Sequence, residues 1–439
     1  MSTTTNTVAE QVRSRYQPQH PSHLRKRYRS EWFFKIYGLV SVLIGLSFLF
    51  IMFTSIIWNG WSAFLQANLK LEVFLDQKKI NPDGKSDLNT LRHVNFKSIM
   101  RNSLYEQLGL SGNLKPKIRR QLNKLLSRNA DMQIREYVLA NPSSIGKTVE
   151  VTVLAHGNVD AFLKGSISRD IPSEKRQIND QQVEWIDQLV SSGTLVMKWN
   201  WGLFKFGASS QPETAGLLVA IVGSIFMMLI VIVLAVPLGV AAAAYLEEFA
   251  PKNWITDIIE VNINNLAAVP SIVFGLLGLA VFINIFGLPR STAIVGGLVL
   301  TLMTLPTVII ATRASIRAVP RSIREAALAM GASKMQTLFH HTLPLALPGV
   351  LTGTIIGLVQ ALGETAPLLM IGLVAFVVDV PSTLLEPSTA LPVQIYMWAR
   401  SAERGFVERT AGATIVMLIF IIFMNTIVAI LRRRFESKW

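Results

Sequence analysis

Long apolar runs constrain the fold of this chain more than any other feature. A membrane-spanning helix needs about 20 consecutive, mostly apolar residues, because a helix rises about 1.5 Å per residue and the hydrocarbon layer is about 30 Å thick. Six runs of the sequence reach that length: 36–58, 215–246, 266–286, 292–312, 345–377 and 410–431. We therefore expect a mainly α, polytopic membrane protein with one N-terminal transmembrane helix followed by a core of five.

The composition agrees with a membrane protein and excludes several other classes. Charged residues make up 16% of the chain, whereas about 25% is usual in soluble proteins. The sequence has no cysteine, which excludes disulfides, thiolate metal sites and a cysteine nucleophile. The net charge of +14 would suit nucleic acid, but the basic residues cluster beside apolar runs, where membrane orientation explains them. We expect no catalytic residue, no metal, no cofactor and no nucleic-acid partner.

Charge also predicts the orientation of the chain in the membrane. Residues 1–35 are polar and basic, and such segments stay in the cytoplasm, so the helix 36–58 should run outward. Counting spans from there places the loop 313–345 and the basic tail 432–439 in the cytoplasm as well. The loop carries the positive charges that this orientation requires: Arg313, Arg317, Arg321, Arg324 and Lys334.

Residues 59–212, here called the insert domain, carry many charges and no run long enough to span a membrane. Segments 96–108 and 115–127 have apolar residues at helical spacing. In contrast, 149–154 alternates like a strand and 194–206 resembles a hairpin. We expect a small α+β domain on the periplasmic side of the membrane.

The loop 313–345 carries signals for two short helices. Ser322 and Glu325 form an S-x-x-E capping box, which should start the first helix, and Gly331 supplies the left-handed residue that ends it. Ser333, with a glutamine three residues later, should open the second helix. Two prolines should end that helix: Pro344 and Pro348.

The same loop resembles the EAA loop of ABC-transporter permeases. The residues that carry the resemblance, together with the helix-starting serine, are Ser322, Glu325, Ala326, Ala327, Gly331, Leu343 and Pro344. The resemblance implies that the first short helix docks on a dimer of cytoplasmic ATPase subunits and transmits their ATP-driven closure to the membrane helices. The chain has no P-loop of its own, so it should not be an ATPase. One departure is His341, where the family usually has an apolar residue.

Polar and helix-breaking residues inside the apolar runs indicate where a transport pathway could lie. Glu364 falls near the middle of the run 345–377, where an acid costs about 2.5–3.5 kcal/mol on insertion scales. It should face the bundle interior, be protonated, or pair with a base such as Arg313 or Arg290. A structural role for this acid and direct substrate contact are equally open. Prolines occur in four runs, and such breaks are tolerated against protein or a water-lined cavity: Pro237, Pro270, Pro306 and Pro367.

A narrower resemblance covers the core from about residue 215 to the end. Segments 268–275, 363–369 and 390–396 are similar to motifs of PstA-type phosphate-importer permeases. The resemblance implies a bacterial inner-membrane subunit that transports phosphate with a second, PstC-type permease and a periplasmic phosphate-binding protein. The substrate-pathway residues assigned with it are Gln360, Glu364, Thr365, Pro367, Pro270, Ser271 and Thr307. Many members of the family have an arginine where this chain has Gln360, which donates hydrogen bonds but supplies no charge.

Three alternatives remain open from the sequence. The same loop occurs in importers of other oxyanions and of organic solutes. In a different class, a secondary transporter would use an ion gradient with Glu364 as its proton site. A membrane-anchored phosphate sensor is a third idea. The insert domain could dock the binding protein, guard the pathway or contact another envelope component.

Overall fold

The computed structural model describes residues 21–80, 94–110 and 114–435. The chain divides into two compact units, residues 1–58 and residues 59–439, which are described separately here. In the first unit, α2 (Pro21–Gly60) is a single long helix that contains the expected span 36–58. Of the two expected basic tails, residues 1–20 and 436–439 lie outside the described part of the chain.

Five described helices are long and apolar enough to cross a membrane, and a bent helix pair would make a sixth span. The five are α2, α11 (Leu218–Ala244), α14 (Ala293–Ala318), α17 (Leu343–Gly363) with the residues just before it, and α20 (Gly405–Phe435). The bent pair joins α12 (Trp254–Ala267) to α13 (Ser271–Gly278), which a π-helical turn continues to Ile285. The expected mainly α, polytopic fold is confirmed.

The run 266–286 is not the straight helix that its hydropathy predicts. α12 begins upstream at Trp254, where the Asn253 side chain accepts a hydrogen bond from the backbone N–H of Thr256 at 3.0 Å. The helix then breaks, and the pair is bent by 101°. The break lies at Pro270 because a proline has no N–H and disfavours the helical conformation of the residue before it.

The run 345–377 differs from the prediction in two ways. Pro344 and Pro348 do not end a helix, because the chain stays helical from Lys334 to Gly363 and both prolines lie within α17. A π-helical turn (Leu338–Thr342) precedes Pro344 and already departs from the regular hydrogen-bond ladder that a proline interrupts. α17 instead ends at Gly363, and a short helix, α18 (Ala366–Met370), follows. Glu364 therefore lies at a helix break and not in the middle of a span.

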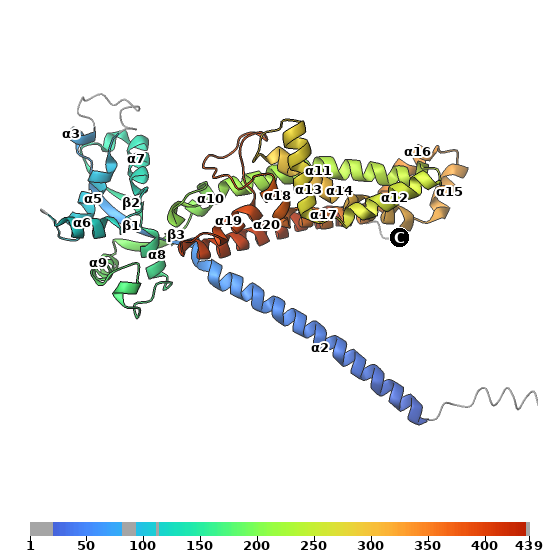
Figure 1. The fold of residues 1–439 in the computed structure, drawn as a ribbon, viewed down its shortest axis with the longest axis horizontal. Helices are drawn as coiled ribbons and strands as arrows, with labels where there is room; N and C mark the ends of the chain where they lie inside the picture. The colour runs from blue at the N-terminus through green and yellow to red at the C-terminus, as the bar shows by residue number, and fades with distance from the viewer. Residues whose placement is uncertain (1–20, 81–93, 111–113, 436–439) are drawn as a thin grey trace, which may run out of the picture. The chain divides into compact units, whose positions relative to one another are not determined.

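The core helices pack through small residues. α14 lies beside both α11 and α17, as Figure 1 shows, and α20 packs against α17 and α19 (Leu391–Ala399). A Cβ added at Gly353 of α17 would lie 2.1 Å from the Cβ of Ala311 on α14. A larger side chain would therefore force the two helices apart, as is usual where membrane helices approach closely.

The insert domain is built on a three-stranded antiparallel sheet of order β2-β1-β3. Its strands are β1 (Leu65–Phe74), β2 (Thr148–Leu154) and β3 (Leu195–Trp199). Its helices are α3 (Gln77–Ile80), α5 (Phe96–Gln107), α6 (Pro116–Asn123), α7 (Ala130–Ala140), α8 (Gly157–Leu163), α9 (Asp180–Ser191) and α10 (Gly202–Lys205). Fully buried Leu71, Phe96 and Ile134 join the sheet to α5 and α7. The α+β fold expected for this part of the chain is confirmed.

The hairpin expected over 194–206 is wrong. β3 pairs with β1, far away in the sequence, and the chain then turns at buried Asn200. The Asn200 amide donates to the carbonyl of Ala63 at 2.9 Å, and its Oδ1 accepts from the N–H of Leu203 at 3.2 Å. These side-chain bonds start α10 where the sequence pattern suggested a second strand.

Candidate functional site

Two helix breaks meet in the core. α13 packs against α18, and a Cβ added at Gly275 would lie 2.7 Å from the Cα of Pro367. The segments 268–275 and 363–369, singled out in the sequence, are therefore neighbours in space. Irregular backbone at membrane depth is tolerated only where protein covers it or it lines a water-filled cavity, and here each break is packed against the other.

The structure places the predicted pathway residues around these breaks. Ser271 is the first residue of α13, directly after Pro270, and is half-buried. Glu364 and Thr365 are half-buried in the connection between α17 and α18. Gln360 is exposed one turn earlier on α17. Thr307 is half-buried on α14, and within the described chain no hydrogen bond joins it or Gln360 to Glu364.

The basic partners considered for Glu364 lie elsewhere. Arg290 is exposed, and Arg313 is buried and held by two other acids. Its Nε donates to Glu247 Oε1 at 2.6 Å, and its Nη2 contacts Glu260. In the part of the chain that the structure describes, no base is paired with Glu364.

Three arginines and three glutamates form what we call the arginine cluster: Arg313, Arg317, Arg324, Glu247, Glu248 and Glu260. Arg317 Nε donates to Glu247 Oε2 at 2.9 Å, and Arg324 Nη1 lies 3.2 Å from Glu248 Oε1. The cluster connects the end of α11, α12 and α14 to α15 (Arg321–Ala329). The sequence predicted the arginines as an orientation signal, and Arg313 also as a possible partner of Glu364, but not their pairing with these three acids. The acids that flank the same apolar runs were the available sign of their partners.

The start of α15 is not the predicted one. The helix begins directly after Pro320, and no side chain caps it. The expected capping box of Ser322 and Glu325 is therefore wrong. Pro320 has the extended backbone of an N-cap residue, with φ −54° and ψ 135°, and it brings the helix start forward, so Ser322 lies inside the first turn.

The end of α15 and the start of the next helix are as predicted. Gly331 has a φ of +87°. Its N–H donates to the carbonyl of Leu328 at 3.0 Å, and the N–H of Ala332 donates to that of Ala327 at 3.1 Å. These are the two bonds of a Schellman motif. Ser333 and Gln336 form the expected capping box of α16 (Lys334–Thr337).

Apolar side chains project from this helix pair into solvent. Met330 is 89% exposed. Its exposed apolar neighbours in the sequence are Leu328, Met335 and Phe339, the last in the π-helical turn before α17. We call these four side chains the ridge. Glu325, Ala326, His341 and Pro344 are exposed too, Leu343 is half-buried, and Ala327 is buried beneath the helix. A short amphipathic helix with such a face fits an apolar groove on a partner protein.

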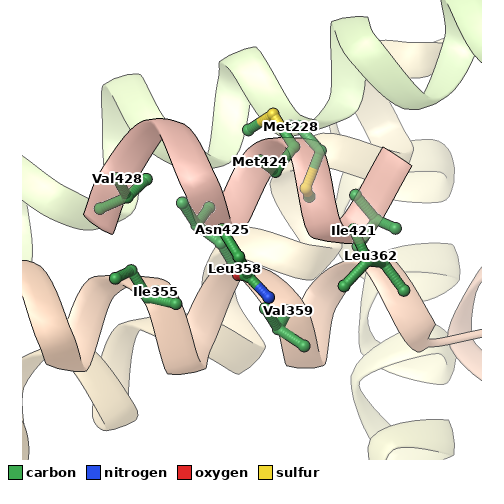
Figure 2. Close-up of a pocket in the computed structure, with 9 residues that line it drawn as sticks. All are labelled: Met228, Ile355, Leu358, Val359, Leu362, Ile421, Met424, Asn425 and Val428. Atoms are coloured by element: carbon green, nitrogen blue, oxygen red, sulfur yellow. The ribbon is translucent and has the colours of Figure 1, made fainter. Parts of the chain in front are cut away.

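A small hollow lies among α11, α17 and α20. Figure 2 shows the side chains that line it, among them Met228, Leu358 and Asn425. Its volume is about 10 Å³, about enough for a single water molecule. The lining is apolar apart from the asparagine, so this hollow is a packing defect and not a substrate site. Within the described residues, no group of three His, Asp or Glu side chains could hold a metal ion.

A second set of buried charges joins the insert domain to α20. Lys164 Nζ lies 2.7 Å from Asp160 Oδ2 and 2.6 Å from Glu408 Oε1. Asp160 Oδ1 also accepts the backbone N–H of Ala67 in β1 at 2.8 Å. Buried Arg409 and Glu213 complete what we call the lysine cluster, and the Gln66 amide donates to the Glu213 carbonyl at 2.6 Å.

Comparison with known proteins places the chain in a class. Residues 235–439 match the family described as "Binding-protein-dependent transport system inner membrane component". Residues 21–173 match a domain of unknown function, DUF3333, which includes α2 and most of the insert domain. The chain belongs to this family of multi-pass inner-membrane permease subunits, in its PstA type. Such subunits are the transmembrane components of ABC transporters and are not enzymes.

Individual relatives carry more specific names. The probable ABC transporter permease protein YqgI of Bacillus subtilis (strain 168) is 33% identical over 214 residues, which cover 46% of this chain and 72% of the relative. The phosphate transport system permease protein PstA 1 of Mycobacterium tuberculosis (strain ATCC 25618 / H37Rv) is 31% identical over 227 residues, or 52% and 72% of the two chains. The PstA protein of Yersinia pestis is 30% identical over 222 residues, covering 50% and 74%.

Among solved structures, the MetNI methionine ABC transporter in an inward-facing conformation is similar to part of this chain. The match covers 50% of this chain and 97% of that chain, with 18% identity and a TM-score of 0.41. That likeness is too low to support an inference about function.

Proposed function

We propose that this chain is a permease subunit of an ATP-driven phosphate importer. It would form the translocation pathway with a second permease of the PstC type, take phosphate from a periplasmic binding protein and couple to two cytoplasmic ATPase subunits. Relatives named as phosphate transport system permeases support the substrate. The EAA-like loop with its exposed ridge supports the ATPase partner.

The proposal includes an orientation. Both termini would be cytoplasmic, with basic tails at 1–35 and 432–439, and the span 36–58 would lead outward to a periplasmic insert domain (59–212). The permease domain 215–431 follows, with its coupling loop 313–345 in the cytoplasm. The support is the basic residues of the loop and of both tails.

One observation carries the coupling role. α15, α16 and the π-helical turn after them carry the ridge, and the arginine cluster connects α15 to three core helices. Arg324 contacts Glu248 at the end of α11 and the carbonyl of Ile316 on α14. A displacement of α15 by a partner would therefore reach these helices directly and could open or close the pathway.

The pathway is assigned to the region of the two helix breaks. Ser271, Thr365 and Gln360 offer hydrogen bonds to phosphate oxygens, with Thr307 on the neighbouring helix. Glu364 repels an anion, and Gln360 supplies no positive charge. Either the partner permease provides that charge or the pathway binds phosphate weakly, and a conduit needs no tight site.

The decisive experiment is ATP-stimulated phosphate uptake into vesicles that contain all the subunits. Competition by sulfate or molybdate shows whether phosphate or another oxyanion is the substrate, because the same loop occurs in importers of other oxyanions. An importer needs its ATPase, whereas a secondary transporter using Glu364 would work without one. Uptake driven by an ion gradient in vesicles that lack the ATPase would reject the proposal.

The coupling role has a sharper test at Gly331. Replacing Gly331 with valine should abolish uptake while the complex still assembles, because a β-branched residue resists the left-handed conformation, at a cost of about 1–2 kcal/mol. No atom lies within 4 Å of an added Cβ at this position, so the effect would be conformational and not steric. Gly331→Asn is the matched control, since asparagine enters that conformation more readily. Undiminished uptake in Gly331→Val would remove the coupling role.

A further inference from the structure

A basic hollow lies in the insert domain, away from the helix breaks of the core. Its volume is about 300 Å³. Three separate segments supply its basic lining: α5, the turn between α6 and α7, and the residue before α8. The basic side chains are Lys97, Arg101, Lys124, Arg128 and His156.

The positive charges of this lining are poorly balanced. Within the described chain, Arg101, Lys124 and Arg128 have no carboxylate within ion-pair distance. Lys97 lies 3.9 Å from Asp131, which Arg135 shares at 3.7 Å. These exposed like charges repel one another across the hollow, and a bound anion would relieve that repulsion, which solvent and salt screen only in part.

The positive potential extends beyond the first hollow. Asn123 also lines a second hollow of about 530 Å³, whose basic residues are Lys117, Arg119 and Arg120. The Asn123 Oδ1 accepts the Tyr105 hydroxyl at 2.7 Å, and both Arg101 and Arg119 act on that tyrosine electrostatically. The two hollows therefore lie on one basic surface, along which an anion would be attracted.

His156 gives the hollow a directed donor. Its Nδ1 accepts the backbone N–H of Asn158 at 3.1 Å, so the neutral ring carries its proton on Nε2. Burial lowers the pKa of His156, Arg128 and Lys124 act in the same direction, and Glu213 and Glu403 oppose them. In the described chain, the Nε2–H has no hydrogen-bond partner and is free to donate to a ligand.

Two polar groups beside the hollow, the Ser127 hydroxyl and the Glu213 carboxylate, already have partners within the protein. The Ser127 hydroxyl lines the hollow and donates to Glu213 Oε1 at 2.9 Å, and that buried carboxylate also interacts with Arg409. The carboxylate is therefore partly neutralised behind the lining. The charged groups that line the hollow are all hydrogen-bond donors, so a ligand must supply acceptor oxygens and negative charge.

We propose that this hollow is a binding site for a small, multiply charged oxyanion of the phosphate type, separate from the membrane pathway. Guanidinium and ammonium groups of α5 and of the turn between α6 and α7 would bind the anion, and His156 would be a further donor. Because most of these donors are exposed, binding should be reversible and should weaken as salt is added. The site does not depend on which solute the core transports.

The test is binding of labelled inorganic phosphate to the full-length chain in an uncharged detergent, by equilibrium dialysis at low ionic strength. The Arg101→Gln, Lys124→Gln, Arg128→Gln variant should bind phosphate about 10-fold more weakly or worse, because it loses three charge-assisted donors. The matched control, Lys78→Gln, Lys147→Gln, Lys175→Gln, removes the same charge outside both hollows and should stay within about 2-fold, as expected for exposed charges.

Further arms separate this site from the others. Glu364→Gln alters the proposed pathway, so the triple variant should lose the same share of phosphate binding with and without this substitution. Sulfate should lower phosphate binding more than chloride of equal ionic strength does. Each single substitution at Arg101, Lys124 or Arg128 should weaken binding by itself, which keeps the test valid if the triple variant folds poorly. An equal loss of phosphate binding in the control variant would show that the overall positive charge of the domain, and not this hollow, attracts the anion, and it would overturn the proposal. Unchanged binding in the hollow variants would overturn it too, whatever the uptake assay shows.

Discussion

The arginine cluster beside α15 and the lysine cluster beside the insert domain both pair buried charges at a junction of the core, but they use different basic groups. Each holds buried charges where the core meets another part of the protein. The first sets three arginines against three glutamates, and Arg317 at its edge is exposed. The second sets Lys164 and Arg409 against three acids, and one ammonium group serves both Asp160 and Glu408.

The difference between arginine and lysine predicts how each junction responds when a neighbouring helix moves. A guanidinium has several donors in a fixed plane, so an arginine that contacts two carboxylates fixes the directions of the helices that carry them. A lysine ammonium is a compact point charge on a flexible stem, and it can keep its contacts while its neighbours rotate. We therefore expect the arginine cluster to transmit movements of α15 to the core and the lysine cluster to hold the insert domain while tolerating them.

The largest expected effect is at Arg313. Arg313→Met should lower the free energy of unfolding by about 3–5 kcal/mol, because it removes a buried guanidinium that pairs with both Glu247 and Glu260 and leaves these acids only the exposed Arg317. Arg317→Met, on the same helix and with the same two acids as partners, should cost less than about 1 kcal/mol, because that side chain is exposed. Thermal unfolding of the purified chain measures both. Equal losses in the two variants would contradict the buried role of Arg313, and adding Glu247→Gln to Arg313→Met should recover part of the loss.

A somewhat smaller effect is expected at Lys164. Lys164→Met should lower the free energy of unfolding by about 3 kcal/mol, because Asp160 and Glu408 then lose the buried ammonium group that they share and keep only the electrostatic interaction with Arg409. Hydrogen exchange should rise in β1 around Ala67 and in the first turn of α20, while α15 keeps its protection. Lys175→Met, on an exposed lysine of the same domain, is the control and should change neither. Increased exchange that reached α15 would mean that the two clusters act as one unit.

The two serines of the coupling loop distinguish a real cap from an apparent one. Ser333→Ala should cost about 1 kcal/mol of local stability, because its hydroxyl accepts the N–H of Gln336. Ser322→Ala should stay within about 0.5 kcal/mol, since that serine caps nothing. Hydrogen exchange at the first amides of α15 and α16 gives both values. A larger loss at Ser322 than at Ser333 would restore the capping box that the sequence suggested.

The smallest effect is a pH dependence at the insert domain. Burial holds the pKa of His156 below its ordinary value, so the unfolded chain binds the proton more readily than the folded domain. The neutral histidine therefore contributes fully to the free energy of unfolding above the pKa of the unfolded chain, which is about 6.5. This contribution is lost as the pH falls from there through the pKa of the folded domain. Unfolding followed from neutral into mildly acidic solution should show this loss. His156→Asn, which keeps a capping side chain, should reduce it, and an unchanged slope would assign the pH dependence to other groups.

Local signals in the sequence were reliable where the chain alone decides the outcome. Gly331 ends α15 because only a residue that tolerates a positive φ can close a Schellman motif, and Ser333 caps α16 with a glutamine three residues away. The strand at 149–154 and the helix at 96–108 followed from their periodicity. Such features depend on residues only a few positions away in the chain, so the sequence alone is enough to predict them.

Signals failed where distant parts of the chain compete for the same residues. The sequence does not predict β1, which closely follows the first span, and it predicts a hairpin at β3 because the true partner strand lies more than a hundred residues away. Ser322 met the pattern of a cap, but Pro320 had already started the helix. Glu364 was placed in mid-span because hydropathy does not register a helix end at Gly363.

By itself, the sequence determined that this is a polytopic helical membrane protein with an α+β insert and an EAA-like loop. Apolar length, charge and capping motifs are properties of short stretches. Length and charge determine how a segment inserts into the bilayer, and capping residues act on the backbone beside them. Only the tertiary structure decided that α13 and α18 meet at their breaks, that Arg313 is committed to Glu247 and Glu260, and that a basic hollow forms in the insert domain. Each of these joins residues far apart in the chain, and their proximity follows from packing that no local pattern encodes.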